Sequence, residues 1–115
     1  MTDSQINSLS LAKDMIAIDA TSLTPDDIAQ LQRLILDYSA VAMCGSVQPW
    51  GRKLRDWAQN QQTTGKARLI GSGELANAAT SALANGTSAH GYELDDTHEA
   101  SNSHPGAVVI SAALA

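Results

Sequence analysis

The chain has 115 residues, enough for one domain or part of one and enough to bury a core. It contains 19 alanines, only four aromatic residues and no Phe. Because Ala has the highest helix propensity, this composition favours a compact helical protein over a sheet-rich one. A single cysteine, Cys44, excludes an internal disulfide framework.

The charges are divided unevenly along the chain. All seven Lys and Arg residues lie between Lys13 and Arg68, so residues 69–115 carry the whole net charge of −5. Without a basic face, nucleic acid is not expected as a partner. The chain has no apolar run of the roughly 18 residues that a membrane span needs, and its first residues do not resemble a secretory signal. We therefore expect no membrane partner and a cytoplasmic location.

Helical signals dominate the first half of the chain. Apolar residues recur at helical spacing over residues 5–19, which predicts a first helix. A second helix is predicted to begin at Pro25 after a capping Thr24, and to stop at Gly45. A third is predicted over residues 48–61.

The second half alternates apolar segments with polar turns. The predicted elements are a short strand at 66–70, a helix from Ser72 to Ala84, a helical segment at 87–94, a loop at 95–104 and a helix from Pro105. Asn85 and Gly86 are interpreted as a helix stop. The predicted fold class is thus mainly all-α, with one short extended segment near 66–70.

The final segment is apolar on nearly every side. It ends without a glycine, a basic residue or a polar turn. From this pattern we expect residues 1–115 to be the N-terminal portion of a longer helical domain.

Three histidines and several carboxylates are concentrated in one short polar stretch between two apolar segments. They are His90, Glu93, Asp95, Asp96, His98, Glu99 and His104. Histidine titrates near neutral pH and a neighbouring carboxylate favours its protonated form, a combination suited to proton transfer. A solvated acidic loop whose histidines cap helix ends is the plainer alternative.

Two other kinds of site were weighed. His90 and Glu93 are three residues apart and could share a helix face as metal ligands, but no strong zinc pattern is present, so metal binding ranks below proton transfer. The segment from Gly71 to Ala76 fits the dinucleotide-binding pattern G-x-G-x-x-A. The sequence offers no second strand to carry the acid of that motif, so a helix cap is the favoured interpretation.

The region from Leu83 to Ala115 resembles the signature region of the MmgE/PrpD family. The resemblance rests on Asn85-Gly86, Ala89-His90, the run Glu93-Leu94-Asp95-Asp96-Thr97-His98, and His104-Pro105-Gly106. Residues 34–45 are similar to the family's second helix. Many members have Asp where this chain has Glu93, and the loop from Thr97 to His104 is one residue longer than in the decarboxylase branch.

The resemblance implies a helical domain paired with a smaller lid domain, which would be absent here, in a homodimeric enzyme that needs no metal and no other cofactor. Family members act on small di- or tricarboxylates by dehydrating 2-methylcitrate, decarboxylating cis-aconitate or epimerising an imino diacid. The longer loop argues against decarboxylation. We therefore expect a 2-methylcitrate dehydratase-like lyase, with a decarboxylase or an epimerase as the alternatives. An inactive helical fragment that self-associates is the alternative from another class.

By position, Glu93, Thr97 and His104 match residues that line the family's active site. His104 is the candidate for proton transfer, Glu93 for orienting or tuning a histidine, and Thr97 for hydrogen bonding the substrate. Supporting roles are expected for His90, His98, Asp95 and Asp96. Because residues 69–115 have no base, the cations that a polyanionic substrate requires are expected beyond Ala115.

Overall fold

A computed structural model describes residues 7–115, and the chain divides into two compact units, residues 1–31 and 32–115. The described elements are α1 (Ser8–Ala17), η1 (Ala20–Ser22), α2 (Pro25–Ser46), α3 (Pro49–Asn60), β1 (Ala67–Arg68), β2 (Leu75–Ala76), α4 (Ala78–His90), η2 (Glu99–Ser101) and α5 (Pro105–Leu114). The prediction of a mainly all-α fold is confirmed. None of the described helices has both the length and the apolar character needed to cross a membrane.

The predicted first helix is present but shorter than expected. Residues 5 and 6 lie outside the described residues, and α1 begins at Ser8 because the Asn7 side chain accepts hydrogen bonds from the backbone N–H groups of Leu9 and Ser10. It ends at Ala17, and a short 3-10 turn follows. No residue of α1 is buried.

The start of α2 agrees with the prediction. Thr24 Oγ1 accepts a hydrogen bond from the Asp27 N–H, while the Asp27 carboxylate accepts from the Thr24 hydroxyl at 2.7 Å and from its N–H at 2.9 Å. This reciprocal cap satisfies backbone donors that a helix start leaves free. The bond from the Thr24 side chain, followed by that from its backbone, lowers the pKa of Asp27.

The predicted stop of α2 at Gly45 is wrong, because the helix continues to Ser46. Gly45 is buried where α2 meets α4, and a Cβ atom at this position would collide with the carbonyl of Ser88. The glycine is therefore needed for close approach of two helices, not for termination.

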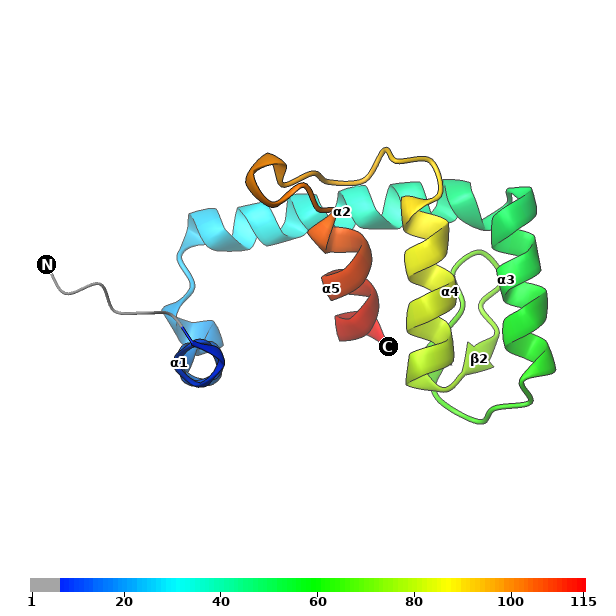
Figure 1. The fold of residues 1–115 in the computed structure, drawn as a ribbon, viewed down its shortest axis with the longest axis horizontal. Coiled ribbons are helices and arrows are strands. Elements are labelled where there is room, and N and C mark those ends of the chain that lie inside the picture. The colour runs from blue at the N-terminus through cyan, green and yellow to red at the C-terminus, as the bar shows by residue number, and fades with distance from the viewer. Residues whose placement is uncertain (1–6) are drawn as a thin grey trace, which may run out of the picture. The chain divides into compact units, whose positions relative to one another are not determined.

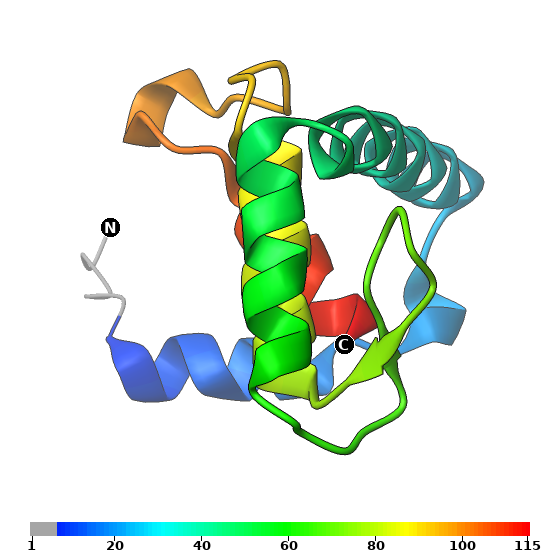
Figure 2. The same cartoon turned by 90° about the vertical axis from the view of Figure 1, so that its right-hand side faces the viewer.

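In the second unit, α4 lies between α3 and α5 (Figure 1), and α3 runs alongside α4 when the molecule is turned (Figure 2). Small side chains allow these helices to pack closely. One core cluster contains Tyr38, Ala42, Ala89 and Ala107, and a second contains Ala58, Leu69 and Ala84. The Tyr38 hydroxyl is also hydrogen-bonded to the Ser111 hydroxyl at 2.8 Å, which ties α2 to α5.

The segment before α4 is a β-hairpin, and this corrects two predictions. The extended segment near 66–70 is present as β1, but it pairs antiparallel with β2, so the helix predicted to start at Ser72 is wrong there. Gly71 and Gly73 lie in the hairpin turn with φ of 90° and 75°. Because no helix follows this turn directly, the hairpin excludes the dinucleotide-binding interpretation of the glycines.

The helix stop predicted at Asn85 and Gly86 is also wrong, because α4 begins at Ala78, after a capping Asn77, and continues to His90. The Asn85 side chain accepts a hydrogen bond from the Ile70 N–H and donates one to the Arg68 carbonyl, both at 2.8 Å. The asparagine is thus retained within a helix because its amide satisfies the backbone of the hairpin.

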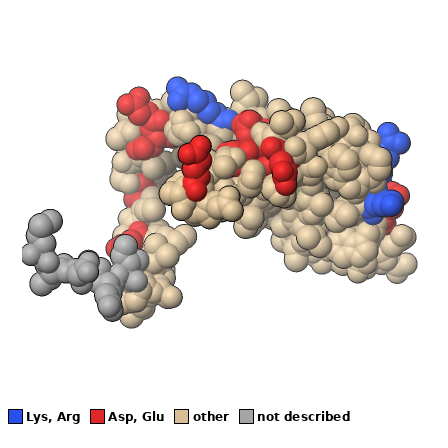
Figure 3. Space-filling view, turned by 45° about the horizontal axis from the view of Figure 1, so that its top comes forward, with Lys and Arg blue, Asp and Glu red and all other residues tan. Residues whose placement is uncertain are grey.

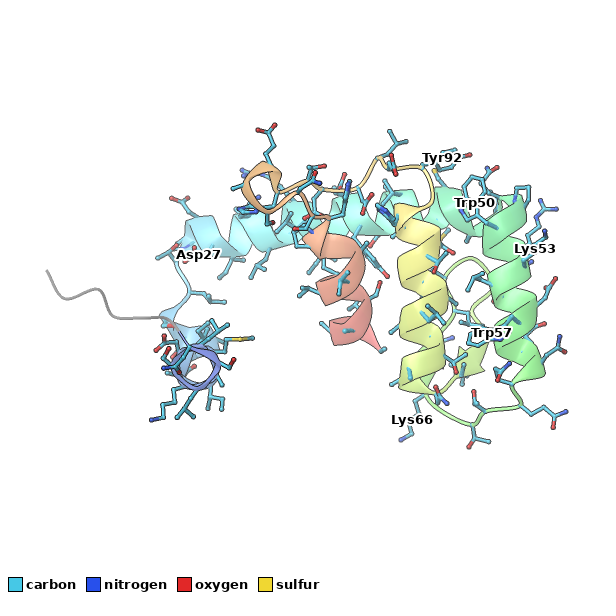
Figure 4. The ribbon with its side chains drawn as sticks, in the orientation of Figure 1. Asp27, Trp50, Lys53, Trp57, Lys66 and Tyr92 are labelled. Carbon is cyan, nitrogen blue, oxygen red and sulfur yellow. The ribbon has the colours of Figure 1, made fainter. Side chains whose placement is uncertain are left out.

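An aromatic pair joins the start of α3 to the turn that follows α4. Trp50 and Tyr92 lie close together in Figure 4, with ring centroids 5.2 Å apart and an edge-to-face angle of 80°. Such pairs contribute about 0.5–1.5 kcal/mol beyond the area they bury. The contact holds the beginning of the loop that leads from α4 to α5.

Candidate active site

The candidate site is formed where α4 ends and α5 begins. His90 is the last residue of α4, and His104 is the residue immediately before α5. These two helices pack together, so the loop brings the two histidines side by side although 14 positions separate them in sequence. The His90 carbonyl accepts a hydrogen bond from the Glu93 N–H at 2.8 Å, which starts the turn.

Further along, the predicted loop folds back on itself. The His98 N–H donates to the Ser103 carbonyl at 2.9 Å, and the Ser103 N–H donates back at 3.4 Å. Between them lie the short 3-10 turn η2 and Asn102 in the left-handed conformation, with φ of 48°. This closed turn returns the chain toward α4 and delivers His104 beside His90.

The loop buries one carboxylate beneath the two imidazoles. Nδ1 of His90 and Nδ1 of His104 lie 3.2 Å and 3.3 Å from the same oxygen, Oδ1 of Asp95. The two rings contact each other edge to face, with centroids 4.6 Å apart. The side chain of Asp95 is only 1% exposed, whereas those of His90 and His104 are 47% and 28% exposed.

The two contacts of Asp95 differ in geometry. His90 Nδ1 is positioned to hydrogen-bond to the carboxylate, whereas His104 Nδ1 is within ion-pair distance but forms no hydrogen bond with any described residue. The Asp95 oxygen must therefore lie away from the direction in which an N–H at His104 Nδ1 would point. The carboxylate of Asp95 consequently has one well-oriented donor, although its oxygens can accept several hydrogen bonds.

The neighbouring Asp96 fixes the start of α5. Its Oδ1 accepts a hydrogen bond from the Gly106 N–H at 2.9 Å, which caps a helix whose own N-cap residue, His104, provides no side-chain bond. A Cβ atom at Gly106 would collide with this carboxylate, so the cap requires glycine at that position. The negative charge of Asp96 also suits the positive end of the helix dipole.

A groove of about 720 Å³ runs between α4 and α5, with both imidazoles in its lining. Its other lining residues are small or apolar for the most part, and they include Ala82, Gly86, Ala107, Val108 and Ser111. Acidic side chains are visible on the surface in Figure 3, where the face carrying the loop has been brought forward. His90, His104, Asn102 and Ser103 make one end of the groove polar, whereas its walls are mainly apolar.

A sequence model of the MmgE/PrpD N-terminal domain matches residues 10–115. This chain belongs to the MmgE/PrpD family. The match covers the whole of the second unit, including both histidines and the groove. No curated protein and no solved structure matches the chain.

Of the site residues that the sequence predicted for this MmgE/PrpD domain, the structure brings together His90, Asp95 and His104. Asp96 lies next to them but contacts the backbone of α5. Asp95 lies between His90 and His104, and its supporting role stays a prediction. The catalytic role of His104 stays a prediction.

The other three predicted residues lie elsewhere on the loop. Glu93 is exposed, with a left-handed backbone at φ of 52°, and Thr97 is also exposed. His98 is exposed and its Nδ1 is hydrogen-bonded to the Ser101 hydroxyl at 2.7 Å. Within residues 7–115, no hydrogen bond or ion pair joins the side chain of any of these three to His104. Their roles stay predictions.

The metal-ligand pair weighed for this MmgE/PrpD domain, His90 and Glu93, does not share a helix face, because α4 ends at His90. Instead, the three residues with ligand atoms close enough to hold an ion are His90, Asp95 and His104, all within 4.8 Å of one another. These are the same side chains that are suited to proton transfer.

The groove itself was not predicted from the sequence. Its floor depends on small residues spaced four apart, Ala82 and Gly86 on α4 and Ala107 and Ser111 on α5. This spacing is a recognisable signal, because residues four apart lie on one helix face and small ones allow two helices to approach. Ser111 was missed although it is buried and holds the Tyr38 hydroxyl.

Proposed function

We propose that this protein provides part of the acid–base site of a metal-independent lyase that removes water from a small hydroxy-tricarboxylate, as 2-methylcitrate dehydratase does. The observation that carries the proposal is the pair of imidazoles, His90 and His104, sharing the buried carboxylate of Asp95 at the edge of a groove. Decarboxylation and epimerisation of related acids also need proton transfer, and they are the competing reactions within the family.

The elimination needs both a base and an acid. The base removes a proton from the carbon next to a carboxylate, the acid protonates the departing hydroxyl, and a carbon–carbon double bond and water are formed. The Asp95 carboxylate lies 3.2 Å from Nδ1 of His90 and 3.3 Å from Nδ1 of His104, so the three groups are close enough to pass a proton among them. We assign the transfer at the substrate to His104, and to Asp95 and His90 the task of holding and supplying its proton.

Two exposed residues complete the proposed site. Thr97 would donate a hydrogen bond to a substrate carboxylate or hydroxyl, and Glu93 would orient or tune a histidine once substrate is bound. Both side chains are accessible from solvent. Residues 69–115 contain five acidic residues and no Lys or Arg, so this segment on its own would repel a polyanionic substrate. We therefore propose that residues outside this chain supply the cations, in an enzyme that works as a homodimer.

The test is an assay with 2-methylcitrate and cis-aconitate as substrates, on the purified chain and on the enzyme that carries this domain. In the active form, His104→Ala is expected to lower turnover at least about 100-fold, because general acid–base catalysis contributes about that much. Asn60→Ala is the control, since this residue is exposed at the end of α3 and lies outside the candidate site. Near-normal activity of His104→Ala would remove His104 from the mechanism.

A further inference from the structure

The buried carboxylate of Asp95 is poorly compensated. It is 1% exposed, and one ring nitrogen of His90 is its only hydrogen-bond donor among the described residues. Its two ion-pair contacts are with His90 and His104, and the segment that carries it, residues 69–115, contains no Lys or Arg. Because removing a carboxylate from water is costly unless it is paired, this position favours a cation.

A second observation concerns His104. Its Nδ1 is buried and has no hydrogen-bond partner in the part of the chain that the structure describes, although Asp95 Oδ1 is 3.3 Å away. Buried ring nitrogens are normally satisfied. An unprotonated Nδ1 at this position offers a lone pair, which is what a metal ion requires of histidine.

The spacing of the three groups also suits a metal. Zinc bonds of about 2.0–2.1 Å to nitrogen and oxygen place neighbouring ligand atoms about 3.4 Å apart in a tetrahedron. The distances from Asp95 Oδ1 to the two histidine nitrogens are 3.2 Å and 3.3 Å, and the three ligand atoms all lie within 4.8 Å of one another. Two imidazoles and one carboxylate leave a fourth position for water, and the 47% exposure of His90 provides a path of entry.

From these observations we infer that His90, Asp95 and His104 form a site for a divalent transition-metal ion of the zinc class, which binds in competition with protons. The ion neutralises Asp95 and bonds to Nδ1 of His104, which has no hydrogen-bond partner among the described residues. In combination with the proposed function, on which this last step rests, the bound ion inhibits the enzyme because it occupies the imidazoles that transfer protons.

Binding is tested directly on the purified chain with Co²⁺, whose visible absorption reports its coordination, and with Zn²⁺ by titration calorimetry. We expect one ion per chain, and we expect Zn²⁺ to displace Co²⁺. His90→Ala and His104→Ala should each weaken binding at least about tenfold, the lower end of what even an outer-shell partner contributes. Affinity should fall as the pH is lowered, because a protonated imidazole has no lone pair to donate.

His98→Ala is the matched control and should bind the ion as the parent chain does. His90→Ala is the decisive variant, because this side chain is half exposed and its loss leaves the core intact, which circular dichroism verifies. A dissociation constant weaker than about 0.1 mM, or equal weakening by His98→Ala and His90→Ala, would overturn the metal site. The proposed lyase activity is tested separately, by measuring turnover in the presence of a chelator. If this activity is absent, the Co²⁺ titration still tests the metal site, because ion binding does not depend on turnover.

Discussion

Tyr38 is a core residue whose ionisation makes the stability of the fold depend on the pH of the solvent. Its ring is buried against Ala42, Ala89 and Ala107, and its hydroxyl reaches Ser111 on α5. Burial raises the pKa of Tyr38, and the bond to Ser111 opposes this effect to a smaller extent. The phenol is therefore held in its neutral form in the folded chain.

This raised pKa gives a prediction for stability against pH. Above the ordinary tyrosine pKa of about 10, the unfolded chain loses a proton that the folded chain retains, so stability falls as the pH rises. Urea unfolding between pH 8 and 11 should show this decline, and Tyr38→Phe should reduce it. Tyr92→Phe is the control, since Tyr92 is partly exposed. An unchanged decline in Tyr38→Phe would contradict the argument.

At the same scale, the sequence predicted the chemistry of the site better than its geometry. The density of histidine and acid between two apolar segments was enough to identify the region. Which residues meet depends on the turn at Glu93, on the left-handed Asn102, and on the packing of α4 against α5. Glu93 and Asn102 have no periodic pattern that fixes their backbone conformation, so Asp95 could not be selected as the shared carboxylate.

At the scale of elements, the starts of α2, α3 and α5 were predicted well because capping is local. Thr24 before α2, Pro49 at α3 and Pro105 at α5 are all signals contained within a few residues. The hairpin and the true length of α4 were missed because they depend on tertiary contacts. Ser81 donates a hydrogen bond to the Ala67 carbonyl, and Asn85 bonds to the Ile70 N–H and the Arg68 carbonyl. These contacts join segments that are distant in sequence, so neither the hairpin nor the length of α4 can be predicted from a local pattern.

Asn85 provides a test of this interpretation. Asn85→Ala removes two hydrogen bonds and leaves the Ile70 N–H and the Arg68 carbonyl without these partners. We expect a loss of about 2–3 kcal/mol in unfolding free energy, although Ala is the better helix former. Chemical denaturation measures it, with Asn60→Ala at the exposed end of α3 as the control. A stabilised Asn85→Ala variant would show that the hairpin does not depend on this side chain.

At the scale of the whole molecule, apolar side chains remain on the surface. Val108 and Val109 of α5 are 71% and 62% exposed, α2 exposes Leu36 and Met43, and Val47, which follows α2, is also exposed. Exposed apolar side chains promote association where they form a patch. The chain's helical fold and its family were within reach of sequence reasoning, whereas the surface left uncovered depends on how the helices pack.

We therefore expect the purified chain to self-associate, in agreement with the homodimer that the family resemblance implies. Sedimentation velocity over a range of concentrations should show species larger than the 12.0 kDa chain. Val109→Lys, which places a charge on the outer face of α5 without altering a groove-lining residue, should shift the distribution toward monomer. A parent chain that stays monomeric at every concentration would contradict this expectation.

The two imidazoles are attached to facing ends of α4 and α5, and the groove runs between these same two helices. A ligand that binds in the groove and separates the two helices must also increase the distance between the rings, because each ring moves with its own helix. Filling the groove and separating the two rings are then the same movement. A ligand without any ionisable group is therefore expected to change the geometry of the pair by its size alone.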